Sequence, residues 1–202
     1  MNYIAHIHIA KHTQTSLLGN FLGDFVKGSD LAYLPSELEL GIRLHRGVDK
    51  FTDSHPLVRQ LKQAFPRNLR RMAGVIIDIY FDHLLLNHWH LFSTQSYQSL
   101  FSQFYAELET FSLPDPHYTQ QASRLISTRW LKEYQHEETC YRAFCSIEKR
   151  LKGKIKFAEQ AQVFIIHNRQ QLATSFLQFY PDLLNHGLQL SQSNPTTRKP
   201  PQ

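Results

Sequence analysis

The stretch DIYFDHLLLNHW, residues 78–89, decides the fold class, because it lies in an almost continuously apolar segment over 72–89. A segment of this length and composition is typical of a helix that packs in a protein interior. It nevertheless carries Asp78, Asp82 and His83. An isolated buried charge costs on the order of several kcal/mol unless another group pairs with it. We therefore expect partners for these side chains elsewhere in the chain.

Most of the remaining chain shows the same helical spacing. Apolar residues recur three and four positions apart, and no segment alternates apolar and polar residues long enough to require a strand. The pattern predicts an all-α protein, a helical bundle with a single domain over 1–190, and leaves only the first ten residues ambiguous. The segments with helical spacing are 15–26, 36–55, 57–64, 68–92, 98–110, 122–134, 138–151 and 158–179.

Breaks between helices are expected where proline occurs, at 113–116 and at 180–182. The last segment, 191–202, contains three prolines and has no apolar periodicity. Segments of this composition do not bury enough apolar surface to fold. We predict a disordered tail there.

Composition narrows the class of protein. The 202 residues are 42% hydrophobic and 19% charged, which is ordinary for a globular chain. No apolar run is long enough to span a membrane without interruption, and the first residues lack the pattern of a secretory signal. Cys140 and Cys145 match neither a zinc pair nor a disulfide framework. We expect a cytoplasmic protein.

The net charge of +5 and the isoelectric point near 9.2 indicate an acidic partner. Nucleic acid, a membrane surface and an acidic protein all fit this charge. So does a chain that is merely basic. Charge alone does not decide among them.

Polar residues that could bind a metal gather in the first 90 residues, which hold eight of the 12 histidines. Three apolar helical segments there carry polar pairs four residues apart. A separation of four places both members on one helix face, within about 40°. If these helices pack together, the side chains converge, as in the metal sites of helical bundles. The pairs are Asn20 with Asp24, His45 with Asp49 (Asp53 follows one step further), and Asp78 with Asp82.

Each pair has a simpler explanation. Asp24 could lie near solvent at a helix end, and His45 with Asp49 could form an ordinary surface pair. Asp78 and Asp82 are harder to explain in this way, because like charges repel and their neighbours are apolar. A cation between them would resolve both problems.

The histidines of the first segment, AHIHIAKH (residues 5–12), form a separate case. In an extended chain His6 and His8 would point in opposite directions, so at most one of them would join a common site. We select His6 as a ligand. The alternative is a core histidine with its own hydrogen bonds.

Carboxylate and imidazole ligands without thiolate favour Mn²⁺, Mg²⁺ or Fe²⁺ over a structural zinc. Such an ion polarises a phosphoryl oxygen and lowers the pKa of a bound water. Arg46, beside His45, and Lys27, near Asp24, could offset the charge of a phosphate. These residues point to metal-assisted hydrolysis of a phosphoester, although spacing alone does not identify the ester.

Four segments in order carry a resemblance to a known family: MNYIAHIHIA, LLGNFLGDFVKG, GIRLHRGVDKFTDSHP and DIYFDHLLLNHW. Together they resemble the bacterial acyl carrier protein phosphodiesterase family, with weaker similarity through RWLKEYQ and FYPDLLNHG. The resemblance covers nearly all of residues 1–190. It implies an all-α fold of the HD phosphohydrolase type and a Mn²⁺-favouring site. It also implies hydrolysis of the phosphodiester between 4′-phosphopantetheine and a serine of acyl carrier protein.

The resemblance also implies roles for particular residues. The acidic partner would be acyl carrier protein rather than nucleic acid. The cluster of Arg67, Arg70 and Arg71 could bind it. Alternatively, these arginines are only the solvated start of a helix. Asp49 or Asp53 would accept the proton of the attacking water, and Arg46 would stabilise the phosphoryl oxygens. Asp24 is expected both as a catalytic residue and as a ligand. The expected metal ligands are His6, Asp24, His45, Asp49, Asp78, Asp82 and His83.

Two other functions remain possible. The chain could be an HD-type phosphohydrolase of a small nucleotide. It could also be a non-catalytic helical module in which the polar pairs form buried ion bridges. The excess of aspartates over histidine and arginine on the three polar faces favours a divalent cation over self-pairing.

Overall fold

The computed structural model describes residues 1–193, which form helices joined by turns, with no β-strand among them. The predicted all-α class is confirmed, while the HD-type arrangement stays a prediction. None of the described helices is long and apolar enough to cross a membrane. The elements are α1 (Tyr3–His12), α2 (Leu17–Leu22), α3 (Ser36–Ser54), α4 (Pro56–Ala64), η1 (Arg70–Met72), α5 (Ala73–Asn87), η2 (Trp89–Leu91), α6 (Tyr97–Thr110), α7 (Pro116–Thr128), η3 (Trp130–Gln135), α8 (Glu138–Arg150) and α9 (Ala158–Gln192).

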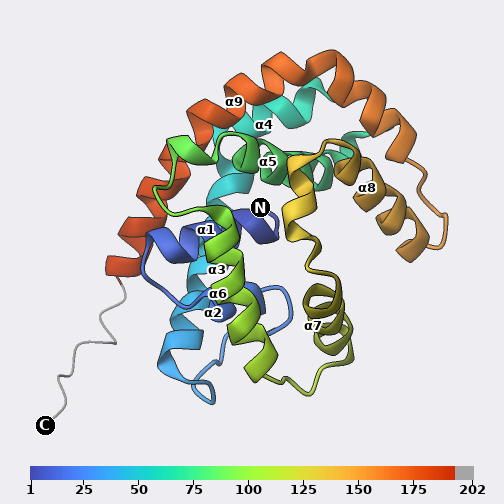
Figure 1. Cartoon of the computed structure of the whole chain (residues 1–202). Coiled ribbons are helices and arrows are strands. Elements are labelled where there is room, and N and C mark those ends of the chain that lie inside the picture. Colours follow the sequence, from blue (N-terminus) through green and yellow to red (C-terminus); the bar gives the residue numbers. More distant parts are fainter. Residues whose placement is uncertain (194–202) are drawn as a thin grey trace, which may run out of the picture.

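Helix α1 lies in the middle of the molecule, and the long helix α9 runs across one side of it (Figure 1). Every residue over 4–10 is buried. A helix that is buried on all sides has no polar face, so its sequence shows no helical period. This is why the first ten residues were ambiguous. The extended chain considered for His6 and His8 is wrong, and both imidazoles point into the core.

The N-terminus of α1 is held by a side chain from another helix. Asp82, in the middle of α5, accepts hydrogen bonds from the backbone N–H groups of Ile4 at 3.0 Å and Ala5 at 2.9 Å. The residue before the helix, Asn2, makes no capping bond with its side chain. A carboxylate at this position satisfies donors that a helix leaves free and interacts favourably with the helix dipole. Asp82 therefore acts as the cap of α1.

Helices α2 and α3 cross at two glycines. A Cβ on Gly41 would lie 2.7 Å from the backbone of Gly19, and a Cβ on Gly19 would lie 2.9 Å from the carbonyl oxygen of Leu38. Only a residue without a side chain allows the two backbones to approach this closely. The crossing brings the end of α2 to His45 on α3.

Several predicted boundaries differ from the structure. The segment 122–134 is not one helix, because α7 ends at Thr128 and Arg129 adopts a left-handed conformation before η3. The apolar segment 68–92 contains only the 15 residues of α5, with a 3₁₀ turn on either side.

The predicted break at 180–182 is wrong, because Pro181 lies inside α9. Its neighbours Tyr180 and Leu183 are fully buried, and this burial favours a continuous helix despite the proline. The helix departs from regular geometry at Asn168 instead. It continues to Gln192, so residues 191 and 192 are helical. The rest of the predicted tail, residues 194–202, lies outside the described part of the chain.

The glycine crossing generates a prediction about stability. Gly41→Ala should lower the free energy of unfolding by about 1–3 kcal/mol, because the new methyl group overlaps the backbone of Gly19. Urea denaturation followed by circular dichroism measures this change. Gly74→Ala, on α5, is the matched control, since its Cβ would make only ordinary contact with Lys62 at 3.5 Å. Equal effects of the two substitutions would contradict the close crossing.

The cap of α1 generates a prediction about pH. Burial raises the pKa of Asp82 to about 7, although the N–H groups of Ile4 and Ala5 favour the charged form. An unfolded aspartate has a pKa of about 3.9. Between these pH values Asp82 binds more protons in the folded chain than in the unfolded chain. The contribution of Asp82 to the free energy of unfolding therefore falls as the pH rises from about 4 to about 7.

Asp82→Asn removes this titration and keeps one acceptor oxygen for the helix end. We therefore expect the stability difference between the original chain and the variant (original minus variant, in free energy of unfolding) to be smaller at pH 7.5 than at pH 5. Urea titrations at both pH values measure the difference. A difference that stays constant would mean that Asp82 does not change its charge in this range.

Candidate metal centre

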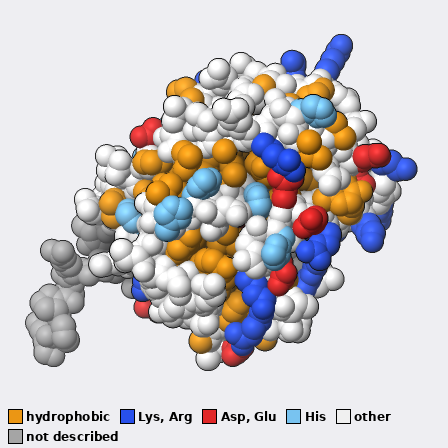
Figure 2. Space-filling model, turned by 45° about the horizontal axis from the view of Figure 1, so that its top comes forward, with side chains coloured by type: hydrophobic (Ala, Val, Ile, Leu, Met, Phe, Trp, Pro, Cys, Tyr) orange, Lys and Arg blue, Asp and Glu red, His pale blue; other side chains and the backbone are white. Residues whose placement is uncertain are grey.

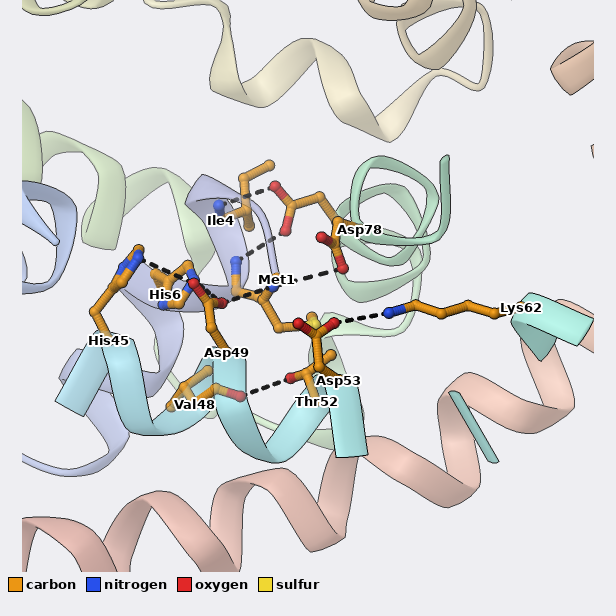
Figure 3. Close-up of polar contacts among 12 residues, drawn as sticks. Met1, Ile4, His6, His45, Val48, Asp49, Thr52, Asp53, Lys62 and Asp78 are labelled. Atoms are coloured by element: carbon orange, nitrogen blue, oxygen red, sulfur yellow. Dashed lines mark hydrogen bonds and ion pairs between the residues drawn. The ribbon is translucent and has the colours of Figure 1, made fainter. Parts of the chain in front are cut away.

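His6, His45 and Asp49 meet at one point between α1 and α3. Each offers one ligand atom, and these atoms all lie within 4.8 Å of one another. His6 Nε2 lies 3.1 Å from Asp49 Oδ1, and His45 Nε2 lies 3.2 Å from Asp49 Oδ2. Figure 3 shows both imidazoles directed at this carboxylate. We call these three residues the metal centre.

The spacing of four residues on α3 places His45 and Asp49 on one face, as the sequence indicated. His6 reaches them from α1, and its ring stacks on that of His45 with 3.8 Å between centroids. Asp24 follows α2 and brings its Oδ1 to 3.7 Å from His45 Nε2. Three segments that are far apart in the sequence therefore supply the side chains.

The electrostatics of the metal centre suit a cation. Burial lowers the pKa of His6 to about 3, so its imidazole is neutral at physiological pH and only one of its two ring nitrogens carries a proton. Burial alone would raise the pKa of Asp49, but hydrogen bonds from His45 and His6 outweigh this effect and hold it well below its usual range. A neutral imidazole beside an ionised carboxylate is the protonation state that a metal requires.

The other nearby carboxyl groups behave differently from Asp49. Burial raises the pKa of Asp24, with His45 opposing and Asp49 adding to the rise. Burial also raises the pKa of Asp78, and the amino group of Met1 opposes it. That amino group lies 2.9 Å from Asp49 Oδ1 and 3.5 Å from Asp78 Oδ1. Asp78 thus faces the amino group of Met1. The metal expected between Asp78 and Asp82 stays a prediction.

The donor set fits a divalent metal ion. Two imidazoles and a carboxylate, without thiolate, are ligands that Mn²⁺, Fe²⁺ and related ions accept. Nδ1 of His6 and Nδ1 of His45 are buried and have no hydrogen-bond partner among the described residues. The chain therefore does not satisfy this polar group of side chains completely by itself.

A pocket of about 420 Å³ borders the metal centre. Its walls include His45, Asp49 and Asp24, together with Lys27 and Arg46. The Arg46 guanidinium donates hydrogen bonds to the carbonyl oxygens of Gly28 at 2.7 Å and Val26 at 2.9 Å. These bonds hold the loop after α2 against α3. Arg46 thus has structural partners and also lines the pocket.

Other residues expected at the site lie elsewhere. Asp82 caps α1. His83 Nδ1 lies 2.7 Å from the carbonyl oxygen of Tyr134 in η3. Asp53 lies one turn beyond Asp49, but its exposed carboxylate accepts a hydrogen bond from Lys62 at 2.7 Å. Figure 3 shows this pair on the other side of Asp49 from the histidines. The structure does not bring these three residues into the metal centre.

The three arginines expected to bind a partner lie between α4 and α5. Arg67, Arg70 and Arg71 are exposed. Arg70 donates a hydrogen bond to the carbonyl oxygen of Phe65 at 3.3 Å, so it also supports the turn before α5.

Gly23 was not selected from the sequence, although it shapes the site. A Cβ at this position would lie 2.2 Å from Cγ of His45. The available signal was a glycine directly before Asp24, at the end of an apolar helix. The distance to His45, however, depends on the crossing of α2 and α3, which the sequence does not reveal.

The packing of Gly23 generates a prediction about metal binding. Gly23→Ala should displace the His45 ring and weaken Mn²⁺ binding by about tenfold or more, a loss typical when a ligand is no longer held in place. Isothermal titration with Mn²⁺ measures the affinity, and circular dichroism checks that the helices remain. Gly74→Ala should bind Mn²⁺ like the original chain. Unchanged binding by Gly23→Ala would show that His45 is not a ligand.

Comparison with known proteins identifies a family that matches most of the chain. The family model described as acyl carrier protein phosphodiesterase matches residues 1–183. A protein from Escherichia coli O6:K15:H31 (strain 536 / UPEC), named acyl carrier protein phosphodiesterase, is 31% identical over 186 residues, which cover 91% of this chain and 96% of the relative. Proteins of the same name from Enterobacter sp. (strain 638) and Shigella boydii serotype 4 (strain Sb227) are 31% and 30% identical over the same shares. No solved structure matches the chain. On the extent of these matches, the chain belongs to the acyl carrier protein phosphodiesterase family.

Proposed function

We propose that this chain is a metal-dependent phosphodiester hydrolase that releases 4′-phosphopantetheine from the serine of holo acyl carrier protein and leaves the apo carrier protein. The family and the names of its relatives support this reaction. The observation that carries the proposal is the convergence of His6, His45 and Asp49 beside a pocket that also contains Lys27 and Arg46. Ligands and cations together suit a phosphate group.

We further propose that His6, His45 and Asp49 hold Mn²⁺, with Mg²⁺ or Fe²⁺ as alternatives. When bound, such an ion supplies a Lewis acid for a phosphoryl oxygen and lowers the pKa of water. Asp24 lies beside this donor set on the pocket side, and Asp78 is a further candidate ligand near Asp49. Asp82 and His83, which have other partners, are not included.

Asp24 is the residue best suited to accept a proton in this reaction. It borders the pocket, and its raised pKa makes its carboxylate a stronger base than an ordinary aspartate. Asp49 is a weaker base, because two histidines stabilise its charge. Asp53 points to Lys62. Arg46 and Lys27, at the edge of the same pocket, would stabilise negative charge on the phosphoryl oxygens.

The acidic partner suggested by the net charge would be the carrier protein. Lysine and arginine side chains form separate groups on the face drawn in Figure 2, among acidic and hydrophobic side chains, so the basic charge is not one continuous field. We retain Arg67, Arg70 and Arg71 as a proposed contact with the carrier protein, since they are exposed and adjacent in space to the start of α5. The free thiols of Cys140 and Cys145 fit a cytoplasmic, reducing location.

The proposed reaction generates a prediction for two matched variants on one helix. Asp49→Asn should lower the rate of Mn²⁺-dependent release of 4′-phosphopantetheine by on the order of 100-fold or more, because it removes an ionised ligand at the reacting group. Asp53→Asn, one turn away and outside the metal centre, should keep most of the activity. Mass spectrometry of holo carrier protein measures the loss of the prosthetic group.

Treatment with a chelator followed by addition of Mn²⁺ tests the need for metal, and a panel of nucleotides tests the alternative substrate. Hydrolysis of nucleotides without any conversion of the holo carrier protein would reject the proposed reaction. Equal loss of activity in the two variants would reject the assignment of Asp49 to the metal centre.

A further inference from the structure

A second pocket lies between the N-terminal end of α1 and the elements α7, η3 and α8, and has a volume of about 280 Å³. This volume is near the lower end of the range of about 300–1,000 Å³ that is typical of small-molecule sites. In Figure 1 the N-terminus lies next to η3, with α7 and α8 beyond it. We call this second pocket the arginine pocket.

Three arginines line the arginine pocket: Arg124 from α7, and Arg142 and Arg150 from α8. All three are exposed, and Glu133 also lines the pocket. Within the described residues none of the three forms an ion pair with Glu133 or another carboxylate, whereas Arg129 and Arg169 pair with Glu109 and Glu137. An anionic or strongly hydrogen-bond-accepting ligand would satisfy guanidinium groups that the chain leaves without a carboxylate.

Two of the arginines are already positioned by their neighbours. Arg142 Nη2 donates a hydrogen bond to Thr139 Oγ1 at 2.9 Å, and the guanidinium of Arg124 lies 6.0 Å from the centre of the Trp130 ring. Holding a guanidinium in place before binding reduces the entropy that a ligand must overcome. The pocket lining also contains the aromatic rings of Tyr3, Trp130 and Tyr134, which suit methyl and methylene groups.

The arginine pocket is next to the metal centre. Asn2 and Tyr3 line it, and His6 lies one helical turn beyond Tyr3 on α1. The Tyr3 hydroxyl accepts a hydrogen bond from Gln121 in the same pocket lining at 3.1 Å. Burial raises the pKa of Tyr3 to about 12; the Asp24 carboxylate adds to the rise, and Arg150 and Arg124 oppose it. A molecule with its phosphorus at the metal centre could therefore extend past Tyr3 into the arginine pocket.

We propose that the arginine pocket binds the phosphopantetheine arm of the substrate and holds the same group in the released product. This inference rests on the proposed function. The arm is a slender chain with two amides, a hydroxyl group and a phosphate at one end. With the phosphate at the metal centre, the guanidinium groups donate hydrogen bonds to the carbonyl and hydroxyl oxygens of the arm, and the aromatic rings contact its methyl and methylene groups.

The test measures binding of free 4′-phosphopantetheine by isothermal titration to the full chain loaded with Mn²⁺. The pocket variant replaces three cations: Arg124→Gln, Arg142→Gln and Arg150→Gln. The control variant carries Lys152→Gln, Lys154→Gln and Lys156→Gln, which change the net charge equally in the exposed loop after α8 and do not line the pocket. The pocket variant should bind at least about tenfold more weakly, and the control like the original chain.

A second variant, Ser146→Trp, fills the arginine pocket with a bulky side chain and leaves every arginine in place. It should also weaken binding of 4′-phosphopantetheine and raise KM for holo carrier protein more than it lowers kcat. Circular dichroism checks the fold of each variant. A merely structural role for these residues would reduce helix content or kcat without this selective loss of binding.

The outcomes separate the two proposals. If the original chain converts holo carrier protein but the pocket and control variants bind 4′-phosphopantetheine equally, the arginine pocket does not hold the arm. If the pocket variant loses affinity only for apo carrier protein, the arginines contact acidic side chains of that protein, and the inference is wrong. If the original chain converts no carrier protein, the proposed function fails, while the titration still decides the pocket.

Discussion

The hydrogen bonds from the backbone of α1 to the Asp82 carboxylate are the interaction on which the rest of the structure depends. They fix the first turn of a helix that is buried on all sides and has no polar face of its own. The position of this turn sets where Tyr3 and His6 lie. Both the metal centre and the arginine pocket therefore depend on one carboxylate from α5, although Asp82 contacts neither of the ligand histidines.

The metal centre combines residues with contrasting protonation. Asp49 is ionised and hydrogen-bonded to two imidazoles, while burial raises the pKa of Asp24, Asp78 and Asp82. Such a difference separates a carboxylate that binds a cation from one that takes up a proton more readily. The same aspartate-rich part of the sequence thus contains a ligand, a candidate base and a helix cap, and their surroundings distinguish them.

Much of the site could be predicted from the sequence, because His45 and Asp49 lie four residues apart on a helix with a clear apolar stripe. Asp24 could be placed beside them from the spacing on its own segment. The role of Asp82 could not be predicted, since a buried aspartate can pair either with a cation or with the N–H groups of another helix. Only the packing of α1 against α5 decides between these partners.

The fold, too, could be predicted only in part from the sequence. The all-α class follows from spacing over most of the chain, but α1 has no period to detect, and Pro181 stays helical because Tyr180 and Leu183 are buried beside it. The arginine pocket also could not be predicted from the sequence. Its three arginines come from α7 and α8, and nothing in their spacing indicates that they face Tyr3.

The central position of α1 has a consequence for the order in which the protein is made. A helix of ten residues is only marginally stable alone, and the partners of α1 are synthesised much later. Asp82 comes 78 residues after Ile4. Tyr180 comes 172 residues after His8, and its hydroxyl lies 2.8 Å from His8 Nδ1. Helix α1 thus gains all of its contacts only after α9 has been synthesised. Folding of this helical protein therefore depends on contacts between residues far apart in the sequence, as is usual for β-proteins. A nascent chain that stops before α9 leaves the apolar surface of α1 uncovered.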